Sequence, residues 1–280
     1  MINEIALREG LKKLLKQTEE DIRQHLLDEP DSELRLKEQH AGAVAAGRSA
    51  SGAYLGFRDE AVTQAAVHWL LGCVFVRFLE DNLLIDEAWI AGPGERLQQA
   101  LDRRQLFYRE NPRANDTDYL IGVFETVAVL PDMAGLFDRA HNPIWRLGPT
   151  GPQAMNILKF FQQRDEDTGE IQHDFTDPDW GTRFLGDLYQ NLSDFAKERY
   201  ALCQTPDFVI DFILARTLEP AIDRFGLDGC RLIDASCGSG HFLLAAFAKL
   251  LNRWREYWPT ATAAELSQKA LDAIYGIDIN

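Results

Sequence analysis

One stretch of this sequence limits the possible fold more than any other. A short apolar run at residues 231–233 leads into Asp234 and then into a turn that contains Gly238 and Gly240. The amphipathic segment 242–254 follows directly, so the order predicts a strand, a tight loop and a helix. Glycine suits such a loop because it accepts positive φ and leaves no Cβ between the backbone and a ligand. The helix N-terminus would then face an anionic group.

A second short strand is predicted near residues 274–278, and it ends with an acid, Asp278. In a doubly wound sheet, ligands bind beyond the carboxyl ends of the strands, where an acid can accept hydrogen bonds from ribose hydroxyls. A dinucleotide site usually has a third glycine three positions after the second, with the acid about 20 residues onward. Here Leu243 takes the place of that glycine, and Asp278 lies much further along. These departures favour a nucleoside without a pyrophosphate, such as S-adenosylmethionine, over a dinucleotide.

The composition indicates a globular chain with room for one large or two ordinary domains, since 46% of its 280 residues are apolar. The sequence contains neither about 18 consecutive apolar residues nor a signal-peptide core, so we expect a cytoplasmic protein without a membrane partner. The cysteines form no C-x-x-C pair and no cluster with histidine. Reduced thiols are therefore expected, with no zinc site and no other metal site.

The net charge of −15 argues against a chain that follows nucleic-acid phosphates over its whole surface. The basic clusters Arg103-Arg104 and Arg109…Arg113 are interleaved with acids. They are interpreted as ordinary solvated helix faces.

Helical periodicity predicts an N-terminal helical domain over residues 1–180. Its expected helices lie near 4–27, 31–48, 60–79, 95–108, 118–129 and 153–163. The most apolar of them, 60–79, should form the domain centre, with His68 and Trp69 in core packing rather than in a ligand site. The polar segment 164–181 marks a connection, and its acids lack the spacing of a calcium loop. Helices are also expected at 184–199 and 207–218, with Thr205 as N-cap and Pro206 in the first turn.

Several motifs together resemble a known family. The order of three motifs resembles that of amino-methylating DNA methyltransferases in the gamma arrangement, which methylate adenine N6. The motifs are Thr205-Pro206, then the glycine loop 234–242, then Gly276-Ile277-Asp278. Upstream, the sequences at 78–82 (Phe-Leu-Glu-Asp-Asn) and 184–189 resemble the helical region before the catalytic domain in type IIG and PglX-type proteins. The sequences at 175–178 (Phe-Thr-Asp-Pro) and 218–222 extend the likeness to PglX-type adenine-specific methyltransferases of BREX phage-defence systems.

This resemblance implies an α-helical N-terminal domain over 1–180, followed over 181–280 by the start of a Rossmann-like, doubly wound α/β domain that binds S-adenosylmethionine. By resemblance, Thr205 and Pro206 flank the methionine end of the cofactor and Asp278 holds the ribose. The residues expected to cradle the cofactor are Asp234, Ala235, Cys237, Gly238, Ser239 and Gly240. Ala235 departs from the family's usual proline, and Gln204 stands where an aromatic residue commonly precedes the Thr-Pro pair.

The adenine-binding tetrapeptide of the family, Asn/Asp-Pro-Pro-Tyr/Phe, does not occur in these 280 residues. Asn111-Pro112 and Asn142-Pro143 lack the second proline. The chain is therefore interpreted as the N-terminal part of a methyltransferase, inactive alone, with no catalytic residue assigned and double-stranded DNA bound through regions beyond it. One alternative is a non-catalytic interaction module that pairs with other defence subunits. The other is a nucleotide-dependent oxidoreductase, which the missing third glycine disfavours.

Overall fold

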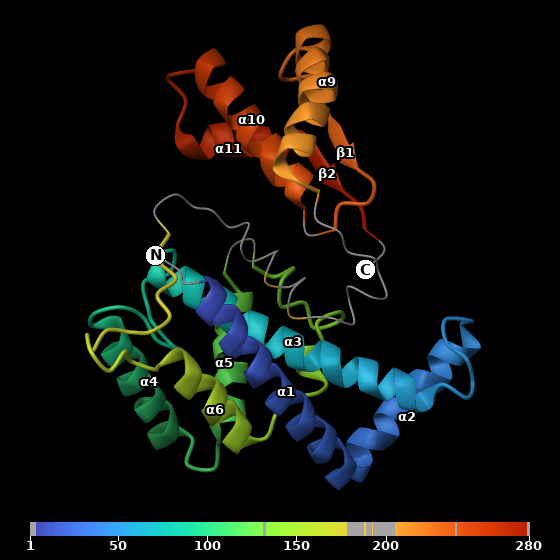
Figure 1. Cartoon of the computed structure of the whole chain (residues 1–280), viewed down its shortest axis with the longest axis vertical. Coiled ribbons are helices and arrows are strands. Elements are labelled where there is room, and N and C mark those ends of the chain that lie inside the picture. The colour runs from blue at the N-terminus through green and yellow to red at the C-terminus, as the bar shows by residue number, and fades with distance from the viewer. Residues whose placement is uncertain are drawn as a thin grey trace. The chain divides into compact units, whose positions relative to one another are not determined.

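The computed structural model describes residues 4–130, 133–177, 188, 192, 205–238 and 240–278. These residues group into two compact units, one formed by 4–177 with Leu192 and the other by 205–278 with Leu188. Figure 1 shows the first unit as a helical assembly and the second as helices around a small sheet. The predicted boundary at residue 180 and most of the predicted helix at 184–199 lie outside the described residues.

The regular elements described in the first unit are helices, and outside them Arg164 and Ile171 form an isolated antiparallel bridge. The helices α1 and α3 pack against each other, α5 packs against α6, and α2 contacts both α1 and α3. The elements are α1 (Glu4–Asp28), α2 (Pro30–Ala45), α3 (Tyr54–Asp81), α4 (Arg96–Glu110), α5 (Asp116–Ala128), the 3-10 turn η1 (Pro143–Trp145) and α6 (Gly151–Phe161). An α-helical N-terminal region is thus confirmed, with each helix within a few residues of its predicted position except at the start of α3.

The centre of the first unit is α3, as its apolar sequence predicts. Trp69 is 1% exposed, its ring meets that of Phe124, and its Nε1 donates to the carbonyl oxygen of Leu147 at 2.9 Å. Burial lowers the pKa of His68, as in core packing. By length and composition α3 could cross a membrane, but 72% of the relevant window is buried inside the protein. Its hydropathy is therefore explained by the core it forms.

The second unit begins with α9 (Asp207–Phe225) and continues with β1 (Leu232–Asp234), α10 (His241–Tyr257), α11 (Ala263–Leu271) and β2 (Ile274–Gly276). The two strands are parallel, with Asp234 opposite Gly276. Parallel neighbours need a crossover connection, and α10 and α11 supply it. Apolar side chains of α9, α10 and α11 form one core, which includes Leu214, Leu250 and Leu266. Both strands match the predicted positions, and within the described residues they form a two-stranded sheet.

Three local expectations about the second unit need correction. Thr205 does not cap α9, and Pro206 does not lie in its first turn. Pro206 is itself the N-cap, and its carbonyl oxygen accepts N–H groups from Val209 and Ile210 at 2.9 and 3.1 Å. The helix also runs past Pro220 to Phe225 instead of ending at residue 218. A further helix, α11, was not predicted, although Thr262 and Glu265 form a capping box at its start.

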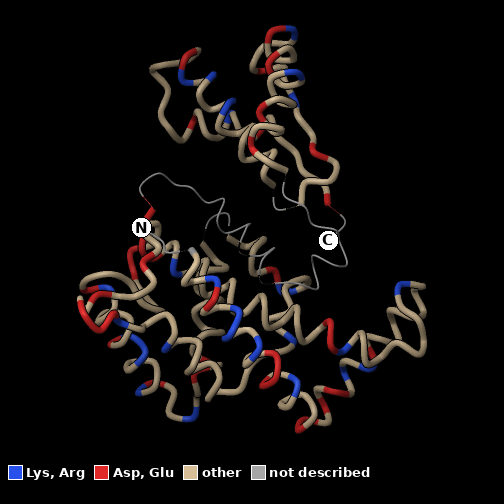
Figure 2. The backbone as a smooth tube through the Cα atoms, in the orientation of Figure 1, with Lys and Arg blue, Asp and Glu red and all other residues tan. Residues whose placement is uncertain are grey.

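Charged residues of both signs are interspersed along the helices of each unit (Figure 2). Arg103 Nη1 lies 2.7 Å from Glu87 Oε2, and Arg104 pairs with Asp116. The pair of Arg103 lies at the surface and fits the interpretation of a solvated helix face. The side chains of Arg104 and Asp116 are only 19% and 11% exposed, so Arg104 lies in a partly buried ion pair and not on a solvated face.

Candidate functional sites

The glycine loop connects the carboxyl end of β1 to the start of α10 and lies against the end of β2. Ile277 donates its backbone N–H to the carbonyl oxygen of Asp234 at 2.8 Å, and Cys237 donates to Ile277 O at 3.0 Å. These bonds continue the pairing of the strands into the loop. Asp234, the last residue of β1, therefore holds Ile277 just after β2, and Ile277 in turn holds Cys237 in the loop.

The loop backbone requires glycine at two positions. Gly238 has φ of 51° and Gly240 has φ of 82°, both in the left-handed region that L side chains rarely adopt. A Cβ at either position would meet nothing within 4 Å. The glycines are therefore needed for conformation, and their outer side is open to a ligand. Gly240 is also the N-cap of α10, as the strand–loop–helix pattern predicts.

Two carboxylates converge on this loop. Asp278 Oδ2 accepts the backbone N–H of Gly238 at 2.7 Å, and Asp234 Oδ1 accepts that of Ser236 at 3.2 Å. Burial raises the pKa of the Cys237 thiol, and the negative charges of Asp278 and Asp234 raise it further. Both acids thus act on one side chain in the middle of the loop.

The structure brings together most of the predicted cofactor residues, namely Asp234, Ala235, Cys237, Gly238, Gly240 and Asp278. Ser239 lies outside the described residues. Thr205 and Pro206 precede α9 in the same unit, and no hydrogen bond joins them to the glycine loop within the described chain. Their predicted contact with a cofactor stays a prediction.

Beside the loop, a mostly apolar cavity of about 390 Å³ runs between β1 and α9. Asp234, Ala235 and Phe242 are among the residues that line it, whereas Gly238 and Asp278 are not. Ile233 on β1 is 62% exposed, and in the described residues β1 pairs only with β2. This part of the sheet therefore has apolar surface available for further packing.

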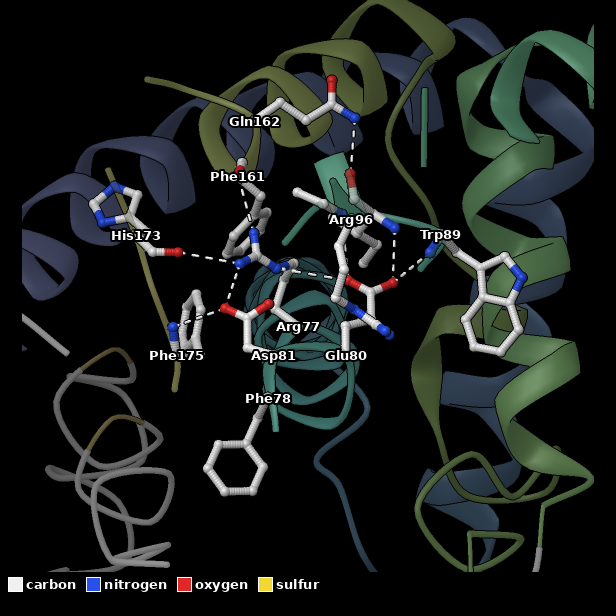
Figure 3. Close-up of polar contacts among 12 residues, drawn as sticks. Arg77, Phe78, Glu80, Asp81, Trp89, Arg96, Phe161, Gln162, His173 and Phe175 are labelled. Carbon is white, nitrogen blue, oxygen red and sulfur yellow. Dashed lines mark hydrogen bonds and ion pairs between the residues drawn. The ribbon is translucent and has the colours of Figure 1, made fainter. Parts of the chain in front are cut away.

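The first unit contains a buried polar cluster at the C-terminal end of α3 (Figure 3). The side chains of Arg77, Glu80 and Asp81 are fully buried. Arg77 Nη2 donates to Asp81 Oδ2 at 2.6 Å and to His173 O at 3.1 Å, while Nη1 donates to Phe161 O at 3.0 Å. One guanidinium group thus joins α3, the end of α6 and the segment 173–177.

Glu80 organises the loop that follows α3. Its carboxylate accepts the backbone N–H groups of Trp89, Ile90 and Ala91 at 2.6, 2.8 and 3.2 Å. Burial raises its pKa to about 7, against the opposing effects of Arg77 and of these three donors. These three consecutive buried N–H groups therefore have the Glu80 carboxylate as their hydrogen-bond acceptor in place of a backbone carbonyl oxygen.

Two sequence motifs that carry the family resemblance meet at this cluster. Phe175 donates its backbone N–H to Asp81 Oδ2 at 2.8 Å, and Asn82 Nδ2 donates to Phe175 O at 2.9 Å. The backbone N–H of Asp177 donates to Asn82 Oδ1 at 2.8 Å. The motif at 78–82 therefore holds the described part of the motif at 175–178 in place, which gives both a structural role.

Sequence reasoning missed the role of Arg77. The sequence places Arg77, Glu80 and Asp81 three and four positions apart within the most apolar helix of the chain. Because unpaired buried charges are costly, this spacing indicates that the three side chains interact. The described residues contain no group of three or more His, Cys, Asp or Glu side chains that could hold a metal ion.

The comparisons with known proteins agree with the resemblance. The chain is 42% identical, over 292 aligned residues, to the "Adenine-specific methyltransferase PglX" of Streptomyces coelicolor. The match covers 100% of this chain and 24% of that protein. No family model matches the chain, and no solved structure matches it. Over its whole length, this chain is therefore a relative of an adenine-specific methyltransferase, PglX, and it spans about a quarter of the length of that protein.

Proposed function

We propose that this chain is the N-terminal part of a site-specific adenine-N6 DNA methyltransferase that uses S-adenosylmethionine in a phage-defence or restriction-modification system. The similarity to PglX supports the methyltransferase class. The observation that carries the cofactor proposal is the convergence of Asp278 and the glycine loop, seen in the 2.7 Å bond from Gly238 N to Asp278 Oδ2.

The loop has the groups that a nucleoside cofactor needs. Two left-handed glycines leave an open face, and two carboxylates lie at the ends of neighbouring parallel strands. In this proposal Asp278 accepts hydrogen bonds from the ribose hydroxyls, and the loop backbone approaches the cofactor closely. Thr205 and Pro206 flank its methionine end. When bound, S-adenosylmethionine supplies the sulfonium methyl group that is transferred.

A complete doubly wound sheet forms part of the same proposal. The exposed Ile233 and the apolar cavity along β1 and α9 would be covered by further strands and helices. The chain spans 24% of PglX. We therefore assign three features to regions outside these residues: the remaining sheet, the adenine-binding tetrapeptide and the DNA-binding surface.

We expect no methyl transfer by the 280-residue chain alone. Amino methylation requires an unstacked base whose nitrogen is aligned with the methyl group, and positioning supplies much of the rate enhancement. The tetrapeptide that would position the base is absent from this sequence. Incubation with labelled S-adenosylmethionine and mixed-sequence DNA should therefore give only background incorporation. Incorporation into adenine would show a catalytic site that this assignment lacks.

The direct test of the cofactor class is a thermal-shift and calorimetric comparison of S-adenosylmethionine with NAD. Selective stabilisation by S-adenosylmethionine is expected, because ligands of the folded state raise its stability. Selective stabilisation by NAD would favour the oxidoreductase instead. No response to either ligand, together with capture of other defence subunits by the chain, would favour the interaction module.

A further inference from the structure

A second cavity, of about 210 Å³, lies within the first unit, where α2, the first half of α3 and the η1 segment meet. Figure 1 shows α2 beside this end of α3. The lining side chains come from three separate stretches of sequence: Ser32, Arg35, Leu36 and Gln39; Ala61 and Gln64; and Pro143, Trp145, Arg146 and Leu147.

The charge lining this cavity is entirely positive. Arg35 and Arg146 line it, and no aspartate or glutamate does, although the net charge of the chain is −15. Arg146 donates to the carbonyl oxygen of Ala140 and pairs with no carboxylate in the described chain. Arg35 makes no hydrogen bond or ion pair to any described residue. Two guanidinium groups therefore retain donors for an external anion.

One acid that interacts with Arg35 through its charge, Glu29, has other partners. Ser32 donates to Glu29 Oε2 at 3.1 Å, and His25 Nε2 lies 3.1 Å from Glu29 Oε1. The Ser32 hydrogen bond lowers the pKa of Glu29, with smaller contributions from His25 and Arg35. The negative charge of Glu29 thus affects the electrostatic potential at Arg35, although Glu29 does not line the cavity.

The rest of the lining consists of two glutamine side chains, an aromatic ring held in place by its neighbours, and apolar groups. The side chains of Gln39 and Gln64 form no hydrogen bond within the described residues. Trp145 is held by its Nε1, which donates to Phe137 O at 3.0 Å, and by Arg139, whose Cζ lies 4.5 Å from the ring centroid. Leu36 is 4% exposed and contributes an apolar wall. The cavity therefore offers cationic, amide and apolar surfaces together.

We infer that this cavity binds a phosphate monoester of a small organic molecule, with the phosphate held by Arg35 and Arg146 and the organic part against Trp145 and Leu36. A phosphate monoester carries a charge of about −1.5 to −2 at neutral pH, which matches two guanidinium groups better than a single carboxylate would. Guanidinium groups also form paired hydrogen bonds with phosphate oxygens. This site is separate from the glycine loop, which belongs to the other unit.

Titration calorimetry of the full chain with uridine 5′-monophosphate tests this inference. The uracil base differs from the adenine of S-adenosylmethionine, and the arginine variants distinguish binding at this cavity from any binding of the ribose at the glycine loop. Arg35→Gln and Arg146→Gln should each weaken binding by about tenfold or more, because each removes charge-assisted hydrogen bonds. Arg113→Gln is the matched control, since Arg113 is exposed and lines no cavity described here.

Inorganic phosphate and uridine separate the two halves of the site. Both should bind more weakly than uridine monophosphate, inorganic phosphate because it lacks the organic part and uridine because it lacks the charge. The inference is overturned if uridine monophosphate does not bind at millimolar concentration, or if both arginine variants bind it as well as the Arg113→Gln control. Equal affinity for inorganic phosphate would also overturn the assignment of an organic ligand. Circular dichroism of each variant confirms that the helical unit remains folded.

Discussion

Asp81 Oδ2 accepts the backbone N–H of Phe175 at 2.8 Å and the Arg77 Nη2 donor at 2.6 Å. One carboxylate oxygen thus joins the last turn of α3 to a segment more than ninety positions further along the sequence. Arg77 lies 5.3 Å from the Phe175 ring centroid, so a cation–π contact supports the same junction. The cluster therefore fixes the path of residues 173–177, the last continuous stretch described in the first unit.

Asp81→Ala should destabilise the first unit by about 3–5 kcal/mol, because it leaves the buried Arg77 charge without its closest partner. It also removes the acceptor of the Phe175 amide. Urea unfolding followed by tryptophan fluorescence measures the change. Glu125→Ala is the control, since it breaks the exposed pair with Arg139 and should cost at most about 1 kcal/mol. Equal effects of the two substitutions would contradict a structural role for the cluster.

His173→Phe should make stability less sensitive to mild acid. Burial, followed by the charge of Arg77, lowers the pKa of His173 from 6.5 to about 4. Between these values the unfolded chain binds a proton that the folded protein does not, so folding stability is lost as pH falls from 6.5 towards 4. Phenylalanine retains an aromatic ring beside Phe160, whose ring centroid lies 4.5 Å from that of His173.

The loss between pH 7.5 and pH 5 should be greater in the wild type than in His173→Phe, by on the order of 1–2 kcal/mol. The raised pKa of Glu80, about 7, acts in the opposite direction, because the folded protein binds the extra proton between pH 4.5 and 7. That contribution is common to both proteins and cancels in the comparison. Parallel pH dependences in urea unfolding would show that His173 takes up its proton equally in the folded and unfolded states.

The elements that local sequence patterns determine were predicted best. Six helices of the first unit and both strands were placed from periodicity, because an apolar stripe or a short β-branched run identifies them without reference to other segments. The loop at 234–240 was identified from its glycines, whose positive φ is a local property. α11 was not predicted, although its capping box is a local sequence pattern.

The features that could not be predicted from the sequence depend on contacts between residues far apart in the chain. The bonds of Arg77 to Phe161 and His173 depend on segments far apart in the chain. The same is true of the cavity that combines Arg35 with Arg146. Asp278 was chosen as a strand-end acid, but its bond to Gly238 required the observed register of β1 and β2. Charges inside an apolar helix signal that a partner exists, without showing which residue it is.

Gly276→Ala should destabilise the second unit by about 1–3 kcal/mol through overpacking. A Cβ there would lie 2.6 Å from Leu243 Cδ1 and 3.0 Å from Cys237 Sγ, so the Leu243 side chain, β2 or the loop must shift. Gly56→Ala is the control, because its Cβ would meet nothing within 4 Å and alanine favours helix by about 1 kcal/mol. Thermal unfolding checks both variants. An unchanged midpoint for Gly276→Ala would mean that Leu243 moves aside without cost.

The central claim, that the loop and Asp278 form an S-adenosylmethionine site, is tested most directly by calorimetry of Asp278→Asn beside Asp272→Asn. Asp272 is an exposed acid near β2 that accepts a hydrogen bond from Gln268 at 2.8 Å, so its variant controls for the change in charge. The claim predicts that Asp278→Asn weakens binding of S-adenosylmethionine by about tenfold or more, from the loss of hydrogen bonds worth about 1.5–3 kcal/mol, whereas Asp272→Asn retains wild-type affinity. Equal affinities in the wild type and both variants would contradict it and leave Asp278 as a strand-end residue that only caps Gly238.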